Sequence, residues 1–388
     1  MRALVYWSLG GVGGVPRFDA LLVKALGELG LDVTVLMPSN VDLNALKRYH
    51  GVDFGELRSI KVVRYGVVDC HNQYCGLLNS FVGNNILNEL ARYHDLLFLD
   101  TLFLRPFRAG TRMVFYLHGA VMTSKPRPVF TLKPHRLFLH GLLSLGSRYD
   151  VLTRKTTRVY ANSLFTAYLT ENALGVRPGV LYPPIDVELI RKYAVSNKEP
   201  IVSMLARFSS SKGQNFVIRA FSRALSICGD EEGLELVLMG AADDLTSLSY
   251  VKHLVKLSRE LGISRRVRFM VNPSIDTVYR VLGRSTAFIH VRPYEPFGIV
   301  VAEAMAAGAI PIVHKSGGPW IDIVRMGKYG LGFSNEEAAL GMCRVMEIAK
   351  ELRDAVMERV HEFSYEAFRN RVDAIYNAEN TQFLEVVA

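Results

Sequence analysis

Short apolar runs of strand length alternate along this chain with longer stretches whose apolar residues recur at helical spacing. In the first half, the predicted strands cover residues 4–7, 33–37, 96–99, 113–117, 158–161 and 179–182, and a helical pattern covers 18–30. Strands and helices in this alternation are typical of a doubly wound parallel sheet. We therefore expect a Rossmann-like α/β domain over residues 1–186.

A polar stretch, residues 191–200, interrupts the pattern and marks the predicted domain boundary. A second series follows, with strands at 201–205, 234–239, 267–270, 287–291 and 310–313 and helices at 216–228 and 248–261. This series predicts a second Rossmann-like domain over 187–369. The expected fold class is therefore α/β, with two doubly wound domains facing each other across a cleft.

The positive charge of the chain is concentrated in one window. The 388 residues carry a formal net charge of +9, and between residues 105 and 158 the only acid is Asp150. The basic residues of this window are Arg105, Arg108, Arg112, Lys125, Arg127, Lys133, Arg136, Arg148, Arg154, Lys155 and Arg158. Leucine- and phenylalanine-rich segments interleave with them, which suits either an anionic membrane surface or a plain solvated face. No nucleic-acid-binding motif accompanies the window, so we expect no nucleic-acid partner.

Neither a membrane span nor a secretory leader is predicted. No run of about 18 apolar residues occurs, and the first seven residues have the pattern of a strand. The four cysteines, Cys70, Cys75, Cys228 and Cys343, are too few and too scattered for a disulfide framework, and no Cys/His set completes a metal site. We expect ordinary thiols in a cytoplasmic protein. The basic window would place it peripherally on the cytoplasmic face of a membrane if this window binds lipid, and the alternative is that the window is a solvated face.

Two glutamates carry the strongest functional signal. Glu295 lies in a predicted loop at the carboxyl end of a strand, where ligands bind in parallel sheets. The helix that follows is predicted to hold Pro296 in its first turn and to stop at Gly308. Glu303 lies about two turns into this almost wholly apolar helix, which is a costly position for a charge without a partner.

Further candidates lie at other predicted strand ends. The backbone N–H groups of Phe297, Gly298 and Ile299 lie between the two glutamates and suit an anionic ligand. A glycine loop, residues 10–14, joins the first strand to the first helix and lets a ligand approach the backbone. Arg207 and Lys212 follow the first strand of the second domain, where a guanidinium fork and an ammonium match phosphate oxygens.

Glu295 and Glu303, with Pro-Phe-Gly between them, resemble the signature of retaining glycosyltransferases of family 4, which have the GT-B fold. Nearly the whole chain fits this pattern, and the resemblance implies that the last helix, about residues 370–388, crosses back onto the first domain. The resemblance implies a nucleotide-sugar donor, retention of anomeric configuration, and front-face attack without an enzyme-bound intermediate. It also implies that catalysis consists mostly of positioning and of stabilising the leaving diphosphate.

The resemblance assigns roles residue by residue. It implies that Arg207 and Lys212 bind the donor diphosphate and that Glu295 and His118 contact the transferred sugar. Glu303 would hold the ribose, while the remaining positions surround the donor or the acceptor. The positions on the donor side are Phe297, Gly298, Ile299, Gly240 and Asn272. The positions in the glycine loop, near the donor phosphates and the acceptor, are Gly11, Gly13, Gly14 and Arg17. Because two cations replace a metal at the diphosphate, we expect no metal and no cofactor.

Several stretches are similar to the α-1,2-mannosyltransferases of dolichol-linked oligosaccharide assembly. They are residues 162–166, 180–186 and 316–324, together with His314. This similarity implies mannose from GDP-mannose and a lipid-linked or oligosaccharide acceptor. Two alternatives remain: a UDP- or ADP-glucose-dependent transferase that acts on a soluble sugar or glucan, and a non-catalytic protein that binds sugar nucleotides or a membrane surface.

Overall fold

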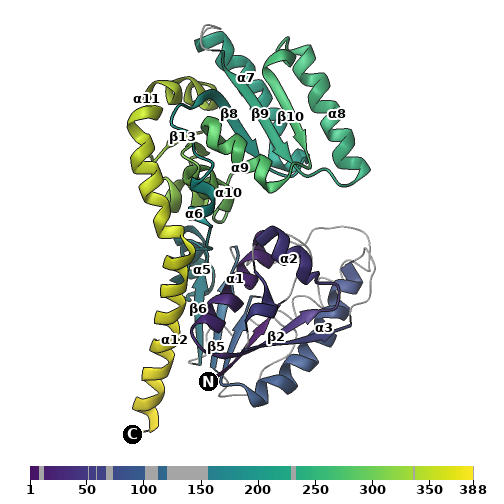
Figure 1. Ribbon diagram of the computed structural model, residues 1–388, viewed down its shortest axis with the longest axis vertical. Coiled ribbons are helices and arrows are strands. Elements are labelled where there is room, and N and C mark those ends of the chain that lie inside the picture. Colours follow the sequence, from purple (N-terminus) through teal and green to yellow (C-terminus); the bar gives the residue numbers. More distant parts are fainter. Residues whose placement is uncertain are drawn as a thin grey trace. The chain divides into compact units, whose positions relative to one another are not determined.

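The computed structural model describes residues 1–7, 13–50, 52–57, 59–66, 73–100, 112–119, 156–228, 233–334 and 337–387. The chain divides into two compact units (Figure 1). Unit 1 consists of Met1–Pro183 with Phe368–Ala388, and unit 2 consists of Pro184–Ala367. Each unit contains one sheet whose strands all pair in parallel.

Unit 1 is built on a seven-stranded sheet in the order β3-β2-β1-β4-β5-β6-β7. Its strands are β1 (Arg2–Tyr6), β2 (Asp32–Pro38), β3 (Ile60–Tyr65), β4 (Leu96–Leu99), β5 (Arg112–Leu117), β6 (Thr157–Ala161) and β7 (Gly179–Val180). The chain first builds outward from β1 to β3 and then returns to build from β4 to β7. The carboxyl ends of β1 and β4 therefore flank the topological switch point of this sheet, which is where doubly wound sheets bind ligands.

Helices cover both faces of the unit 1 sheet because alternate strand residues point to opposite faces. The helices are α1 (Gly14–Glu28), α2 (Leu43–His50), α3 (Gln73–Leu90) and α5 (Leu164–Leu174), with short 3₁₀ segments η1 (Phe54–Glu56) and η2 (Ala91–Tyr93). On one face, Leu4 and Phe115 share a buried cluster with Leu87 of α3 and Ala167 of α5. On the other face, Phe18 of α1 stacks on Tyr116 with 3.8 Å between ring centroids.

The last helix, α12 (Tyr365–Val387), returns to unit 1 (Figure 1). Phe368 lies edge-on to Phe18 at 5.5 Å between centroids, and the Arg371 guanidinium lies 5.3 Å from the centre of the Tyr182 ring. These contacts join the first turns of α12 to α1 and to the segment that follows β7.

Unit 2 is built on a six-stranded sheet in the order β10-β9-β8-β11-β12-β13. Its strands are β8 (Glu199–Leu205), β9 (Glu235–Gly240), β10 (Val267–Val271), β11 (Ser285–His290), β12 (Ile310–His314) and β13 (Leu331–Phe333). Here the order reverses between β8 and β11. The loops that follow these two strands flank the switch point of the second sheet.

Two helical layers sandwich the unit 2 sheet. The helices are α6 (Val187–Arg191), α7 (Gln214–Cys228), α8 (Leu245–Glu260), α9 (Ile275–Arg284), α10 (Ile299–Ala306) and α11 (Ala338–Arg359). Helix α7 packs against α8 and α11, whereas α6, α9 and α10 pack against one another. The described part of unit 2 also contains three 3₁₀ segments, η4 (Ser210–Lys212), η5 (Ser264–Arg266) and η8 (Val360–Phe363), and one π-helical segment, η6 (Pro319–Ile323).

The expectation of ordinary thiols is wrong for two of the four cysteines. Cys228 at the end of α7 and Cys343 in α11 form a disulfide, with 5.6 Å between their Cα atoms. The two residues are 115 positions apart in sequence, and the packing of α7 against α11 brings them together. Cys70 and the side chain of Cys75 lie outside the described residues.

Within the described part of the chain, no helix is both long enough and apolar enough to cross a bilayer. Of the basic window, only Arg112 and Arg158 fall in this part. The other nine basic residues, with which the predicted membrane contact is mainly concerned, lie outside the described ranges.

Candidate functional site

Two cations and a carboxylate flank the switch point of the unit 2 sheet. Arg207 lies two residues beyond β8, and Lys212 ends the short segment η4. Glu295 lies in the loop between β11 and α10, and β11 is the neighbour of β8 in the sheet. The sequence thus places these three side chains on adjacent loops because parallel strands bring their carboxyl ends to one edge.

The electrostatics of Lys212 reflect this proximity. Burial lowers the pKa of Lys212, the negative charge of Glu295 opposes that shift, and the positive charges of Arg292 and Arg207 add to it. An ammonium with a lowered pKa is incompletely solvated, so it gains more from a phosphate oxygen than a surface lysine does. This loop is also anchored, because the Gln214 side-chain amide donates to the backbone carbonyl of Arg207 at 2.9 Å.

The loop that carries Glu295 is held by the segment after β12. The Ser316 hydroxyl accepts a hydrogen bond from the Tyr294 backbone N–H at 2.9 Å, and Gly318 donates its N–H to the Glu295 carbonyl at 2.8 Å. His314 Nδ1 lies 2.7 Å from the same Ser316 hydroxyl. The Ser-Gly-Gly-Pro stretch therefore fixes the backbone from which the Glu295 side chain projects.

Helix α10 begins later than predicted. Its first residue is Ile299 and its N-cap is Gly298, so Pro296 precedes the helix instead of occupying its first turn. Gly298 has φ 88°, a left-handed conformation that glycine adopts without strain. Its predicted end is close, because Ala307 is the C-cap and Gly308 follows with φ 79°. Phe297 is buried beside the start of the helix, with its ring 5.4 Å from that of Phe363.

Glu303 lies little more than one turn into α10, not two turns as predicted. The residue is buried, with 4% of its surface exposed, and the Tyr279 hydroxyl of α9 donates to Oε1 at 3.5 Å. The structure therefore supplies Glu303 with a polar neighbour inside an apolar helix. The hydrogen bond from Tyr279 offsets part of the free-energy cost of burying a carboxylate, and this cost had made Glu303 a candidate in the sequence.

Gly240 ends β9, Asn272 directly follows the adjacent strand β10, and the two residues are hydrogen-bonded to each other. The Asn272 N–H donates to the Gly240 carbonyl at 2.8 Å, and the Asn272 side chain accepts from the Ala242 N–H at 2.8 Å. A Cβ atom on Gly240 would lie 1.9 Å from the carbonyl oxygen of Ala206, so no larger residue fits between β8 and β9 here. Asn272 thus braces the loop after β9 with its side chain.

A cavity of about 680 Å³ opens beside Arg207. Its wall combines the loop after β8 with the start of α8, including Ser209, Asp244, Tyr250 and His253. This volume lies in the range of sites for small molecules and cofactors. Glu295 is not part of its wall, so the cavity extends the site on the Arg207 side only.

Sequence reasoning missed two residues beside Glu295. His290, the last residue of β11, is half-buried, its Nδ1 atom is buried without a hydrogen-bond partner, and desolvation lowers its pKa to about 4. Arg292 forms an ion pair with Glu295. His290 ends β11 and Arg292 follows it, and this strand had been predicted. Glu295 was singled out because ligands bind at the carboxyl ends of parallel strands, and the same argument applied equally to these two residues.

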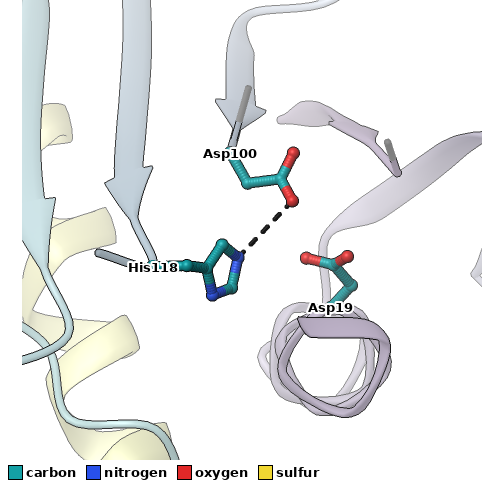
Figure 2. Close-up of side chains that lie close together, drawn as sticks. All are labelled: Asp19, Asp100 and His118. Carbon is teal, nitrogen blue, oxygen red and sulfur yellow. Dashed lines mark ion pairs between the residues drawn. The ribbon is translucent and has the colours of Figure 1, made fainter. Parts of the chain in front are cut away.

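In unit 1, His118 lies immediately after β5 and within a compact cluster (Figure 2). His118 Nε2 is 3.4 Å from Asp100 Oδ2, and Asp19 of α1 lies beside them. The imidazole contacts the rings of Phe18 and Tyr116 edge-on, at 5.2 and 4.8 Å between centroids. Burial raises the pKa of Asp19, and the charge of Asp100 raises it further. Neither aspartate was predicted, although Asp100 directly follows a predicted strand and Asp19 lies in an apolar helix.

Only part of the predicted glycine loop can be described. Gly13 is the N-cap of α1, Gly14 is its first residue, and Arg17 lies half-buried in the first turn. Gly11 lies outside the described residues.

Two doubly wound parallel sheets, one with cations and a carboxylate at its switch point, define a class of α/β proteins suited to phosphorylated ligands. The profile of the family Glycosyl transferases group 1 matches residues 186–362. The chain belongs to this glycosyltransferase family, also known as family 4, and has the GT-B fold.

Curated relatives support the assignment. The mouse protein named GDP-Man:Man(3)GlcNAc(2)-PP-Dol alpha-1,2-mannosyltransferase is 31% identical over 340 residues, which cover 79% of this chain and 68% of that protein. The human protein of the same name is 30% identical over 247 residues, 60% of this chain and 48% of its own length. The alignments thus span between about half and two thirds of these relatives.

Solved structures support the fold. The crystal structure of Anabaena Alr3699/HepE in complex with UDP has a TM-score of 0.70 and 19% sequence identity, and the match covers 97% of this chain and all (100%) of that one. WaaG, a glycosyltransferase involved in lipopolysaccharide biosynthesis, has a TM-score of 0.65 at 14% identity, covering 97% and 99% of the two chains. At these identities the similarity shows the fold alone.

Proposed function

We propose that this glycosyltransferase moves mannose from GDP-mannose to a lipid-linked or oligosaccharide acceptor with retention of anomeric configuration. The observation that carries the proposal is the arrangement of Arg207, Lys212 and Glu295 around the unit 2 switch point. The choice of donor rests on the similarity to the mouse and human proteins named as GDP-mannose-dependent α-1,2-mannosyltransferases.

In this proposal Arg207 and Lys212 bind the donor diphosphate. The guanidinium can donate two parallel hydrogen bonds to phosphate oxygens, while the ammonium adds a second positive charge. As the sugar–phosphate bond breaks, negative charge grows on the leaving diphosphate, and both cations stabilise it. Because they supply this charge, we expect transfer at the same rate with and without added Mg²⁺.

Glu295 would hold hydroxyl groups of the transferred sugar, together with the backbone N–H groups of Phe297 and Gly298. The bracing of its backbone by Ser316 and Gly318 fixes its position before the donor arrives, which lowers the entropic cost of reaching the reactive geometry. Glu303 would accept hydrogen bonds from the ribose. Gly240 and Asn272 would border the nucleotide base, Ile299 would lie beneath the diphosphate, and His118 would contact the sugar.

The proposal is tested by supplying radiolabelled GDP-mannose to the purified protein with membranes from the source cells. We expect label in the organic-extractable lipid fraction, and no label when Glu295→Ala replaces the wild-type protein. Thermal stabilisation by UDP or ADP, with no stabilisation by GDP and no labelled lipid, would instead indicate a glucose donor. Stabilisation by a nucleotide without transfer to any acceptor would indicate a non-catalytic binding protein.

A further inference from the structure

The loop that carries Glu295 contains a strained backbone position. Tyr294 directly precedes Glu295 and has φ 55°, in the left-handed region that residues other than glycine rarely adopt. Tyr294 is 71% exposed, so the packing of its side chain contributes little to holding this conformation. The hydrogen bond from its N–H to the Ser316 hydroxyl, at 2.9 Å, restrains the backbone here. The position of the Glu295 carboxylate therefore depends on a residue from another loop.

The segment after β12 packs directly against the backbone around Glu295. Gly317 has φ 78°, and a Cβ atom there would lie 2.5 Å from the Glu295 carbonyl oxygen. A Cβ atom on Gly318 would lie 2.1 Å from the Pro296 carbonyl oxygen. Glycine alone allows two backbone segments to approach this closely. A shift of Ser316 is therefore transmitted to Glu295, because no flexible side chains lie between these two segments to absorb it.

His314 connects the Ser316 hydroxyl to the core of unit 2. Its Nδ1 atom is 2.7 Å from Ser316 Oγ, and the Ser316 N–H donates to the His314 carbonyl at 2.6 Å, which closes a tight turn. The imidazole lies edge-on to the buried ring of Phe333, at 5.6 Å between centroids. The Lys315 N–H donates to the Phe333 carbonyl at 2.8 Å. Strand β13 thus fixes the imidazole, and the imidazole fixes the hydroxyl.

The hydrogen-bonding capacity of Ser316 matches this arrangement. A hydroxyl has one proton to donate and lone pairs that accept. Because Ser316 Oγ accepts from the Tyr294 N–H, its own proton can go to Nδ1 of a neutral imidazole. Desolvation lowers the pKa of His314, which favours the neutral ring. A chain of hydrogen bonds thus runs from the imidazole through the hydroxyl to the backbone N–H that precedes Glu295.

We propose that His314 is a positioning residue for the transfer reaction. Through Ser316 it holds the Tyr294 backbone in the conformation that presents the Glu295 carboxylate to the transferred sugar. The inference rests on the proposed function, because it assumes that Glu295 contacts this sugar. In this role His314 acts through two hydrogen bonds and contacts neither donor nor acceptor. A small displacement of a group at a reacting centre lowers the rate more than the affinity, so the loss of His314 should appear mainly in kcat.

The kinetic test compares His314→Ala, His314→Asn and His314→Gln in mannose transfer from GDP-mannose. Asparagine places its Oδ1 atom where Nδ1 lies and can accept the Ser316 proton, whereas the glutamine amide lies one bond further out. We expect kcat to fall about tenfold in His314→Ala and His314→Gln, with the KM for the donor within about twofold, and to recover to about half of the wild-type value in His314→Asn. Ser226→Ala is the control, because it removes an exposed hydroxyl that donates to the Ser222 carbonyl within α7.

A second measurement is independent of the donor. Hydrogen–deuterium exchange followed by mass spectrometry reports how well the Tyr294 N–H is protected. We expect exchange at this position to be about tenfold faster in His314→Ala and Ser316→Ala than in the wild-type protein, and to be restored in His314→Asn. If the wild-type protein transfers nothing from GDP-mannose, the proposed function fails, and faster exchange in these variants would still support the bracing of the loop by His314.

Several results would overturn the proposal. One is wild-type kcat, or unchanged exchange of the Tyr294 N–H, in His314→Ala that circular dichroism shows to be folded. Another is equal activity of His314→Asn and His314→Gln, because the position of the acceptor atom would then not matter. The double variant His314→Ala/Ser316→Ala should lose no more activity than Ser316→Ala alone, since the two residues act in series. A double variant whose kcat falls by the product of the two single losses would show that His314 acts by another route.

Discussion

Arg292 donates a hydrogen bond from Nη1 to Oε2 of Glu295 across 3.1 Å, within the loop that follows β11. The Arg292 side chain is 48% exposed to solvent, so this ion pair contributes about 1 kcal/mol or less to stability. Removing the Glu295 carboxylate should therefore change the fold little. An effect of that substitution on turnover can be assigned to the chemistry of the site.

We expect Glu295→Ala to lower kcat by roughly 100-fold or more, because one preorganised polar group at a reacting centre contributes about that much. Its free energy of unfolding should stay within about 1 kcal/mol of the wild-type value. Transfer assays and urea titration measure the two quantities. Glu337→Ala provides the control, since Glu337 is an exposed partner of Lys315. Wild-type turnover in Glu295→Ala would refute the role.

Arg207→Ala should lower both donor affinity and kcat, and Arg207→Lys should recover only part of the loss. A lysine restores the charge but cannot form the two parallel hydrogen bonds of a guanidinium. Fluorescence titration with GDP at two salt concentrations separates charge from geometry, because added salt screens the charge. Full recovery in Arg207→Lys would mean that only the charge matters.

Glu303→Gln should weaken donor binding by about tenfold while kcat falls less, since a ribose contact is made equally before and during the reaction. The amide keeps the volume of the side chain and can still accept from Tyr279. Tyr279→Phe is the matched control, because it removes the neighbouring hydroxyl and leaves the carboxylate in place. A Glu303→Gln variant with normal KM and low kcat would instead place Glu303 in the chemical step.

The Cys228–Cys343 disulfide should contribute about 2–4 kcal/mol to stability, because it closes a long loop in the unfolded chain. Denaturant titration with and without a reductant measures this contribution. Reductant should have no effect on the double variant Cys228→Ser/Cys343→Ser. Alkylation of both thiols in native protein that has never been exposed to reductant would show that the bond does not form.

His290 should make stability depend on pH. Burial lowers its pKa from 6.5 to about 4; the Glu295 charge opposes the shift, and the Lys212 and Arg292 charges add to it. Between these two values the unfolded chain binds a proton that the folded chain does not, so stability falls as pH falls. Between pH 7 and 5 the loss should reach about 1–2 kcal/mol. Urea titrations of wild-type protein and His290→Gln at both pH values check this, and an equal loss in both would contradict it.

The sequence was sufficient to predict the fold class and the ends of most strands. Buried strands such as β8 and β11 are short apolar runs, and their boundaries are encoded locally by polar and glycine residues. Because parallel strands have their carboxyl ends at one edge of a sheet, the sequence also predicted that Arg207 and Glu295 lie at the same edge. Strand β3 escaped prediction because Lys61 and Arg64 interrupt its apolar run, and β13 has only three residues.

Tertiary structure alone decided which distant side chains meet. Asp19, Asp100 and His118 converge because the sheet order sets β4 beside β5, with α1 close to their ends, and no local pattern encodes that order. Cys228 meets Cys343 because α7 packs against α11. The pKa of His290 is lowered because the surrounding protein removes water from its ring. Periodicity reports the direction in which a residue faces within its own element. The neighbours it finds there depend on chain crossovers and on packing across the whole unit.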